Sequence, residues 1–486
     1  MLLDGLVVHG SGARGSHRGP GRGAVGGVGT LPGGEGTPGR GEMPARRSDL
    51  GTDVTGTTDP GPGPAEAGAS RRGLRGLALD LRPLRNRDFR LLWGGELVSE
   101  TGSNLALVAL YIQVFRLTDS TLAVGLIGLV QVVPIVLAAM LGGPIVDRHD
   151  RRRVLLVAHT GEAIAAAVLF ASARLDDPPL ALVYLGAALV AGSATVAQST
   201  RTAMMPRVVG EHELPAATAL NQVAWNTCLI AGPALGGIVV ARLGLAWAYG
   251  IDLLTFAAAL GTVWLLRRQP PTPAEVRDEP EGWRSVMAGF RFLRGRPVLQ
   301  ANFAVDVVAM TFGMPRALFP VLAVTQFGAG PELVGILFSA VAVGAILGAL
   351  TSGWVGRVRR QGRAVLVAVA VWGAGIVAFG LVGDRVLLAL LALAVAGAAD
   401  VVSAVFRNTI LQVNTPDDLR GRLSGIHILV VTGGPRLGDV EAGVVAALAS
   451  PTVSVVSGGL LCIVGVGALA LAVPSFARYR VGDAPR

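Results

Sequence analysis

Long apolar stretches recur along this 486-residue chain from about residue 88 onward. They constrain the fold more than any other feature, because a helix of about 20 apolar residues can cross the roughly 30 Å hydrocarbon core of a bilayer. Twelve stretches reach that length, at 89–115, 119–146, 153–174, 179–203, 214–241, 244–267, 298–324, 331–357, 363–383, 386–408, 420–448 and 452–475. Only 15% of the residues are charged, whereas soluble domains have about 25%, so the sequence predicts an all-α integral membrane protein.

The predicted spans fall into two sets of six, separated by a polar, proline-rich segment. We therefore expect twelve transmembrane helices in two pseudo-symmetric six-helix bundles, residues 84–267 and 298–478, joined by a cytoplasmic linker at 268–297. The linker ends in WRSVMAGFRFLRG, a pattern that predicts a short amphipathic helix. Residues 1–75 are rich in Gly, Pro, Ser, Thr and Arg and are predicted to be a disordered tail, and residues 479–486 form a second tail.

Arginine carries the positive charge of this chain, since the sequence contains no lysine. One set of alternate loops is predicted to hold most of the arginines: Arg148, Arg151 to Arg153, Arg201, Arg207, those of the linker, Arg357 to Arg363, Arg420, Arg422, Arg478 and Arg480. Cytoplasmic loops of membrane proteins carry such an excess of positive charge. The sequence therefore predicts a plasma-membrane protein with both termini in the cytoplasm.

Composition and motifs exclude several other functions. The net charge of +9 does not indicate nucleic-acid binding, because the arginines lie between apolar stretches rather than on one basic face. Without lysine the chain lacks the P-loop lysine that binds nucleotide phosphates, so ATP-driven transport is not expected. No HExxH or GxSxG motif is present, and Cys228 and Cys462 lie in separate apolar stretches without CxxC spacing. We therefore expect no enzyme activity, no cofactor, no metal site and no nucleic-acid partner.

The two predicted halves contain matching motifs at corresponding spans. GPALG at 232–236 in the fifth span recurs as GPRLG at 434–438 in the eleventh. The second and eighth spans both end in glycines followed by basic residues, GGPIVDRHDRRR in one and SGWVGRVRRQGR in the other. Parallel six-helix halves with a substrate pathway between them are a transporter architecture. The repeat therefore predicts transport of a small molecule between two bundles.

The stretch GGPIVDRHDRRRVLL at 142–156 resembles the signature of the major facilitator superfamily between its second and third spans, Gly-x-x-x-Asp-Arg-x-Gly-Arg-Arg. The matching residues are Gly143, Asp147, Arg148, Arg151 and Arg152. Asp150 stands where the family usually has glycine, so the turn there is expected to differ. The resemblance implies a conformational latch at the cytoplasmic edge of the membrane.

The residue types of this motif suit a latch between the halves. Gly143 would let two helices approach closely, because it has no side chain. Asp147 at the membrane edge can meet the positive end of a helix or an arginine, and movement of the halves would break that contact. Arg357 occupies the corresponding position in the second half, so we expect a latch on one side only. A merely solvated loop is the alternative.

AGPALGG at 231–237 resembles the antiporter signature in the exporter branch of the superfamily. The matching residues are Gly232, Pro233, Gly236 and Gly237, and Cys228 replaces the leading glycine. Proline removes a helix hydrogen bond and bends the span, and glycines allow close packing. The resemblance implies exchange rather than symport, and therefore efflux.

From about residue 85 to 478 the chain is similar to the enterobactin-exporter group. The similarity rests on DFRLLW, RTAMMPRVVGEHELPAATALNQ, WRSVMAGFRFL, RALFPVLA, GAILGALTSG and TPDDLRGRLSG. Members of this group are spread over siderophores, drugs and other metabolites. The resemblance therefore implies export of a siderophore-like metabolite or a drug.

Charged side chains within the predicted spans are functional candidates, because each costs roughly 2.5–3.5 kcal/mol to insert at the bilayer centre. They are Glu96, Glu100, Asp306, Arg316, Asp400, Arg436 and Asp439. Spans one, four, seven and ten line the central cavity in the superfamily. We expect Glu100 and Asp306 to carry protons, with Arg316 as a counter-ion or anion contact. Arg436 and Asp439 are three apart and could pair to link the halves, and a passive structural ion pair is the alternative for each candidate.

These features predict a secondary exporter that exchanges protons for a small organic molecule by alternating access. We expect the protein to be a monomer in the bilayer. A proton- or ion-coupled importer is one alternative, and its coupling ion would distinguish it. A membrane sensor that has lost transport is another, although Asp147 and GPALGG are retained.

Overall fold

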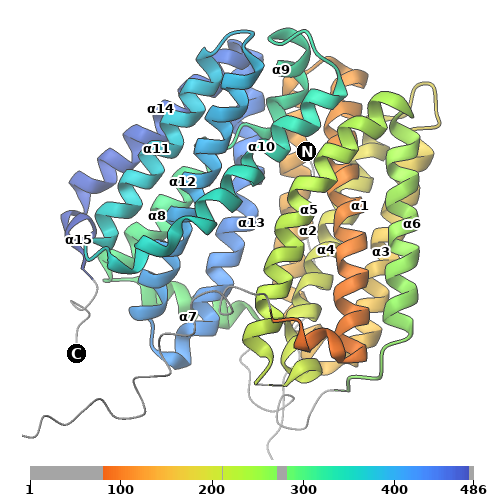
Figure 1. The fold of residues 1–486 in the computed structure, drawn as a ribbon, viewed down its shortest axis with the longest axis horizontal. Helices are drawn as coiled ribbons and strands as arrows, with labels where there is room; N and C mark the ends of the chain where they lie inside the picture. The colour runs from red at the N-terminus through yellow and green to blue at the C-terminus, as the bar shows by residue number, and fades with distance from the viewer. Residues whose placement is uncertain (1–79, 211, 271–281, 481–486) are drawn as a thin grey trace, which may run out of the picture. The chain divides into compact units, whose positions relative to one another are not determined.

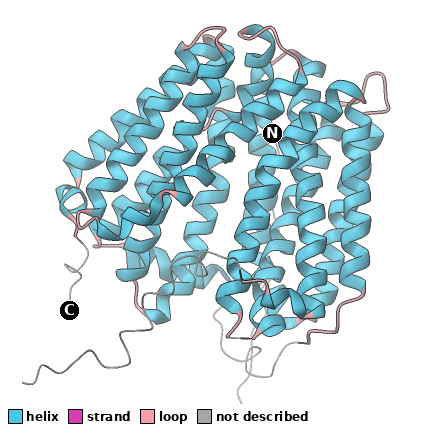
Figure 2. Cartoon of the chain, viewed as in Figure 1, coloured by secondary structure: helices cyan, strands magenta, loops and turns pink. Residues whose placement is uncertain are grey.

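The computed structural model describes residues 80–210, 212–270 and 282–480, which form helices and short connections (Figures 1 and 2). In these ranges ten helical segments are long and apolar enough to cross a membrane. The all-α membrane fold predicted from the sequence is confirmed for this part of the chain.

Two further long helices contain too little apolar sequence to meet that criterion. They are α1 (Arg87–Thr118) and α13 (Asp417–Leu448), with 32 residues each. A count of twelve crossings therefore stays a prediction. The tail predicted at 1–75 lies outside the described residues, as do residues 481–486 of the second tail.

The first half contains six long helices. They are α1, α2 (Thr121–Arg148), α3 (Arg151–Ser172), α4 (Leu180–Val209), α5 (Leu214–Arg242) and α6 (Leu245–Trp264), preceded by the short η1 (Arg82–Arg85). α1 packs against α5 and α6, α3 packs against α4 and α6, and α2 packs against α4.

The second half repeats this packing (Figure 1). After α7 (Gly282–Leu293) it contains α8 (Pro297–Phe312), η2 (Arg316–Leu318), α9 (Phe319–Thr325), α10 (Pro331–Leu350), η3 (Ser352–Arg357), α11 (Gln361–Leu381), α12 (Val386–Val413), α13, α14 (Pro451–Ala472) and α15 (Pro474–Arg478). α8 packs against α13 and α14, α11 against α12 and α14, and α10 against α12. Each of these pairs corresponds to a pair in the first half, so the two bundles are pseudo-symmetric.

Short polar side chains begin several of the helices. The Oδ1 atom of Asn86 accepts hydrogen bonds from the backbone N–H groups of Asp88 and Phe89, at the start of α1. Ser120 caps α2 in the same way, and Ser450 caps α14. Such caps satisfy N–H groups that have no partner within the helix, so they fix where each span begins.

The predicted span 298–324 is interrupted in the structure. α8 ends at Phe312, and the chain turns through Gly313 and Pro315 before α9. Proline cannot donate a backbone hydrogen bond and is disfavoured in a helix interior. The Nε1 atom of Trp372 on α11 donates to the carbonyl oxygen of Gly313 at 2.8 Å, so this freed backbone group is satisfied inside the protein.

The predicted span 331–357 is also shorter as an α-helix. α10 ends at Leu350, and η3 follows from Ser352. The hydroxyl of Thr351 donates to the carbonyl of Leu347 at 2.8 Å, and that of Ser352 donates to Ala349 at 2.6 Å. Threonine makes the same bond inside α1, α3 and α4, so the end of α10 is better explained by the glycines of η3, which disfavour a helix.

The two halves meet along two seams, which we define as the α2–α13 and α5–α10 contacts. A Cβ atom added to Gly125 on α2 would lie 2.5 Å from the backbone oxygen of Asp439 on α13, and one added to Gly237 on α5 would lie 2.6 Å from that of Pro331. Thr121 donates to the carbonyl of Gly443 across the first seam at 3.3 Å. Both seams therefore depend on backbones that approach closely.

These glycine contacts lie near the start of α2 and of α10. We call the end of the helices with Arg148, Arg207, Arg268, Arg360 and Arg478 the basic end, and the other end the opposite end. α2 and α10 both begin at the opposite end and finish at the basic end. The glycine contacts of the seams therefore join the halves at the opposite end.

Candidate functional site

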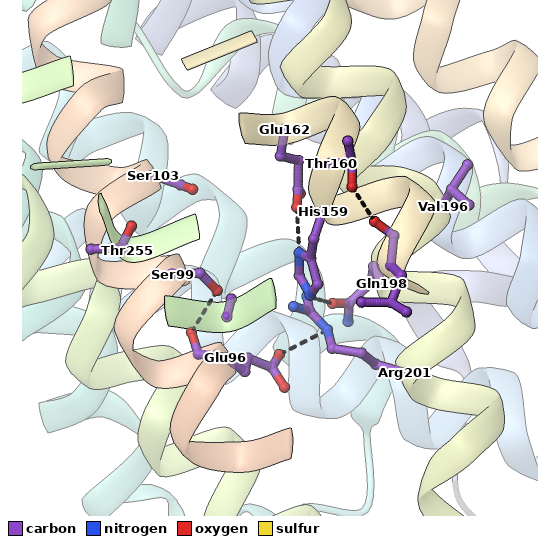
Figure 3. Close-up of polar contacts among 12 residues, drawn as sticks. Glu96, Ser99, Ser103, His159, Thr160, Glu162, Val196, Gln198, Arg201 and Thr255 are labelled. Atoms are coloured by element: carbon purple, nitrogen blue, oxygen red, sulfur yellow. Dashed lines mark hydrogen bonds and ion pairs between the residues drawn. The ribbon is translucent and has the colours of Figure 1, made fainter. Parts of the chain in front are cut away.

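An arginine–carboxylate pair lies inside the first half. Arg201 on α4 is 7% exposed, and its Nε atom lies 3.4 Å from Oε1 of Glu96 on α1 (Figure 3). Its Nη2 atom also donates to Oε1 of Gln198 at 2.7 Å. The sequence-based assignment of Arg201 to a loop is wrong, because α4 continues to Val209 and buries the side chain.

Further carboxyl groups lie close to this pair. Glu100, one helical turn after Glu96, accepts a hydrogen bond from Nδ2 of Asn104 at 3.2 Å. On α3, Oε2 of Glu162 lies 2.6 Å from Nδ1 of His159 (Figure 3). Both side chains are buried.

Asp252 on α6 is another buried carboxyl group of the first half. The charges of Glu100 and Glu162 act on it, so these groups form one electrostatic cluster. Within the described residues, Arg201 supplies the guanidinium group that acts on Glu100. Full ionisation would leave excess negative charge in a buried site, which is unfavourable. The cluster is therefore chemically suited to hold protons.

The second half buries a pair of the same kind. Arg407 on α12 is 2% exposed and forms an ion pair with Asp306 on α8, which is fully buried. The Nη2 atom of Arg407 lies 3.5 Å from Oδ1 of Asp400, whose side chain is 24% exposed. On α13, Nδ1 of His427 lies 3.5 Å from Oδ2 of Asp306. The predicted candidates Asp306 and Asp400 thus share one arginine.

The two pairs occupy equivalent positions in the two halves. Glu96 and Asp306 each lie nine residues after the first residue of their helices, α1 and α8. Arg201 and Arg407 each lie 21 residues after the first residue of α4 and α12. Because α1 corresponds to α8 and α4 to α12, the repeat places one arginine–carboxylate pair in each bundle.

A hydrogen bond links the halves beside the α2–α13 seam. The hydroxyl of Tyr111 on α1 donates to Oδ2 of Asp439 on α13 at 2.7 Å, and both side chains are fully buried. The predicted pair between Arg436 and Asp439 is therefore not the contact that forms; Tyr111 takes the carboxylate instead. This bond satisfies one oxygen of a buried carboxyl group across the interface.

Two buried arginine nitrogen atoms near this bond have no hydrogen-bond partner in the part of the chain that the structure describes. They are Nε of Arg316 and Nη1 of Arg436, and the charges of both arginines act on Tyr111. No ion pair of either residue is present in the described part of the chain. Arg407, not Arg316, is the counter-ion of Asp306 in this structure, and the other role predicted for Arg316, an anion contact, stays a prediction.

The residues of the GGPIVDRHDRRR stretch lie at the basic end, where α2 turns into α3. Oδ1 of Asp147 lies 4.0 Å from Nη2 of Arg151, and each of the two has a further interaction. Arg152 donates through Nε to the carbonyl of Val263 at 3.2 Å and through Nη2 to that of Trp264. These are the last carbonyls of α6, so Arg152 caps a helix C-terminus in its own half. Arg148, the last residue of α2, is exposed.

Asp150 has a structural role at this turn. Its Oδ1 atom accepts hydrogen bonds from the backbone N–H groups of Arg152 at 3.0 Å and Gln269 at 3.1 Å. Its φ of −59° needs no glycine, which explains how the chain departs from the family pattern here. The close helix contact predicted at Gly143 is wrong for this structure, because a Cβ atom there would meet no described atom of a neighbouring element within 4 Å.

The GPALG and GPRLG motifs pack equivalent helices. A Cβ atom at Gly232 would lie 2.5 Å from Cβ of Asn104, so α5 closely approaches α1. A Cβ atom at Gly434 would lie 2.7 Å from Cβ of Met310, so α13 approaches α8 in the same way. Gly236 also contacts α1, whereas Gly237 contacts α10 across the seam. Pro233 lies inside α5. The first motif therefore touches both its own bundle and the other half.

The arginine Arg407 and the carboxyl group Asp252 were not predicted from the sequence. Both lie within apolar helices, and Arg407 has a signal in the repeat, since it corresponds to Arg201 by helix position. Asp252 lies in α6, which is not one of the four spans that line the central cavity in the superfamily. Among the described residues, no group of three His, Cys, Asp or Glu side chains could hold a metal ion.

Comparison with known proteins agrees with this architecture. The chain is 30% identical to the enterobactin exporter EntS of Citrobacter koseri over 393 residues, which cover 81% of this chain and 93% of that protein. It is 29% identical over the same length to the protein of that name from Escherichia coli strain SE11. Residues 78–481 match the transmembrane secretion effector family.

Solved structures of transporters have the same fold. The nucleoside transporter NupG (D323A mutant) aligns with a TM-score of 0.64 at 13% identity, over 80% of this chain and 99% of that one. A bacterial homologue of the human lysosomal transporter Spinster aligns with a TM-score of 0.62 at 14% identity, over 82% of this chain and 97% of that one. These relatives are transporters rather than enzymes. The chain is therefore a multi-pass membrane transporter that belongs to the transmembrane secretion effector family of the major facilitator superfamily.

Proposed function

We propose that this transporter exports a small organic molecule in exchange for protons, by alternating access between its two bundles. The observation that carries the proposal is the pair of equivalent arginine–carboxylate contacts, Glu96–Arg201 and Asp306–Arg407. Buried charges in membrane helices mark substrate or proton pathways. One such contact in each half gives both bundles an element that responds to protonation.

Proton uptake is assigned to the carboxyl groups that lie beside these pairs. In the first half Glu100 adjoins Glu96 and has the neutral side chain of Asn104 as its hydrogen-bond donor. In the second half Asp400 lies at the edge of the pair and is the more accessible carboxyl group. Protonation of either removes a negative charge near an arginine, which then binds its remaining partner more strongly or is free to bind a substrate.

The substrate is proposed to be a siderophore-like metabolite or a drug. The relatives named enterobactin exporters support the first choice. The unsatisfied guanidinium nitrogens of Arg316 and Arg436 support a substrate with acidic or phenolic oxygens, because arginine presents several donors to such groups. Both residues lie near Tyr111, where the two halves meet.

The seams and the motif at the basic end would provide the movement. The seams hold the halves together at the opposite end, with the Tyr111–Asp439 bond beside them. We assign the basic end and both termini to the cytoplasm of a plasma membrane, following the positive-inside rule. On this assignment the opposite end is the closed, outer side, and the Asp147 motif acts as a latch that forms when the basic end closes. A monomer contains both halves and is sufficient for the cycle.

The proposed export is tested by comparing metabolites in the medium and the cell pellet. A deletion strain and its complemented strain are grown with and without iron, and both fractions are analysed by mass spectrometry. We expect one metabolite to be depleted from the medium of the deletion strain and to accumulate inside its cells, most strongly without iron. If no metabolite shifts and no drug becomes more toxic to the deleted strain, the proposal of export is wrong.

Import and sensing predict different results in the same strains. An importer would leave its substrate in the medium of the deleted strain, rather than in the cells. A sensor without transport would keep its effect when Glu100 and Asp306 are replaced by alanine. We favour export because AGPALGG resembles the antiporter signature of exporters and the similar proteins are named exporters.

A further inference from the structure

A groove in the second half lies apart from the proposed transport pathway. It has a volume of about 580 Å³ between α10, α11 and α12, with η3 at one end. Its lining on α12 includes Val395, Val402 and Phe406, which share one face of the helix at this spacing. Asp400 and Arg407 lie on a different face of α12. The groove is therefore separate from the buried arginine–carboxylate pair.

The groove faces away from the first half. α11 packs against α8, α12, α14 and α15, which all belong to the second half. Two residues that line the groove, Val367 on α11 and Val395 on α12, are 53% and 50% exposed although they lie within long apolar helices. Apolar side chains exposed at that depth meet acyl chains in a bilayer. The groove therefore opens sideways to lipid.

The shortened α10 creates this groove. In the first half α2 continues as an α-helix to Arg148, whereas its counterpart α10 ends at Leu350. The chain then turns into η3, where the ring of Trp354 contacts that of Phe406 on α12 with 6.2 Å between centroids. Trp354 is 47% exposed and forms one wall of the groove. Trp354 therefore lines the space that further turns of α10 would occupy, but does not fill it.

The lining combines a long apolar surface with two positive charges. Arg360 and Arg363 line the groove at the basic end, and both are exposed. Neither forms an ion pair with another described residue. The remaining lining is apolar apart from Thr351 and the indole of Trp354. A ligand that complements this surface has an apolar chain and an anionic head.

We propose that this groove binds one anionic phospholipid, with an acyl chain along α11 and α12 and its phosphate at Arg360 and Arg363. Basic pockets between membrane helices bind anionic head groups in this way. The lipid would support the end of α10, a helix that also forms a seam with α5. This inference does not depend on the transported substrate or on proton coupling.

The proposal is tested with the purified full-length protein in detergent. Phosphatidylglycerol and phosphatidylcholine are added in separate titrations, and the midpoint of thermal unfolding is measured. We expect phosphatidylglycerol to raise the midpoint at a lower concentration. The variant Arg360→Gln/Arg363→Gln should weaken the apparent affinity for phosphatidylglycerol about thirtyfold, because each arginine contributes a factor of about five to binding the anionic head.

A matched variant separates the groove from general surface charge. Arg357 and Arg359 are also exposed at the basic end but do not line the groove. Arg357→Gln/Arg359→Gln removes the same charge and should leave the affinity for phosphatidylglycerol nearly unchanged. Equal weakening in both double variants, or an equal response to the two lipids in the unaltered protein, would overturn the proposal.

A second measurement tests where the lipid binds. Ala398 lines the groove from α12, and Ala398→Phe would fill it. Native mass spectrometry of the unaltered protein should detect one retained phosphatidylglycerol, and Ala398→Phe should lose it. Retention by Ala398→Phe would overturn the location. If this variant does not fold, the arginine variants give the same test by loss of the retained lipid.

Discussion

At the scale of residues, the arginines of α4 and α12 explain how carboxyl groups are held inside each half. A buried carboxylate is stable only when a cation and hydrogen bonds compensate for lost water. Arg407 provides the cation for Asp306, and Arg201 provides it for Glu96. The Asp306–Arg407 pair is more deeply buried than the Glu96–Arg201 pair, so its removal should have the larger effect on stability.

Replacement of Arg407 by glutamine should destabilise the protein strongly. Asp306 would then be buried without a cation, and breaking a buried pair costs about 3–5 kcal/mol. The double variant Asp306→Asn/Arg407→Gln removes both charges and should recover most of the loss. Thermal unfolding of the purified proteins measures this difference. Equal instability of the single and double variants would show that the two charges do not compensate each other.

Replacement of Tyr111 by phenylalanine should loosen the contact between the halves. Asp439 would lose its hydrogen-bond donor. A hydrogen bond to a carboxylate changes the equilibrium between the joined and separated halves by a factor of about ten or more. A cysteine introduced at Thr121, beside the seam, should react faster with maleimide in this variant. Tyr249→Phe is the matched control, because its hydroxyl donates to Gln113 within the first half. The same increase in both variants would contradict the role of Tyr111 between the halves.

At the scale of elements, glycines and interrupted helices decide which helices meet. Apolar runs predicted the spans well, because burial in lipid requires that length and composition. They did not predict that α10 ends at Leu350 or that α8 ends at Phe312, because these ends depend on the glycines of η3 and on Pro315. They also did not predict that Gly125 closely contacts the backbone of α13, whereas Gly143 has no such contact with a described residue.

The turn between α2 and α3 allows a test of the proposed latch. Asp147→Asn should impair efflux while the protein still inserts, because the latch needs the negative charge. Asp150→Asn is a matched control, since asparagine also caps a helix and this residue holds the turn. Resistance or metabolite export, together with the amount of protein in the membrane fraction, measures both variants. Normal efflux with Asp147→Asn at normal expression would mean that the carboxylate has no role in transport.

At the scale of the whole molecule, the repeat explains both what could be predicted and what was missed. Matching motifs at 232–236 and 434–438 indicated two related halves, and the structure packs them equivalently. The arginines were harder to predict because Arg201 lies near the end of an apolar run, where it resembles the first residue of a basic loop. Contacts such as Tyr111–Asp439 join residues more than 300 positions apart, which spacing along the chain cannot reveal.

Distances between spin labels across the two ends would test alternating access most directly. Cys228 and Cys462 are buried and can be replaced by alanine to give a cysteine-free background. Labels are attached to exposed positions, one in each half, in two separate pairs: Arg153 with Arg359 at the basic end, and Asp176 with Asp384 at the opposite end. The distances are measured by double electron–electron resonance spectroscopy at about pH 8 and about pH 5. In this range perturbed membrane carboxyl groups take up protons.

Proton-coupled alternating access predicts two distance populations at each end, with the populations of the two ends shifting in opposite directions between the two pH values. The variant Glu100→Gln/Asp400→Asn should remove most of this response to pH, because it removes the two carboxyl groups to which proton uptake is assigned. A single distance at each end that is the same at both pH values would contradict proton-coupled alternating access.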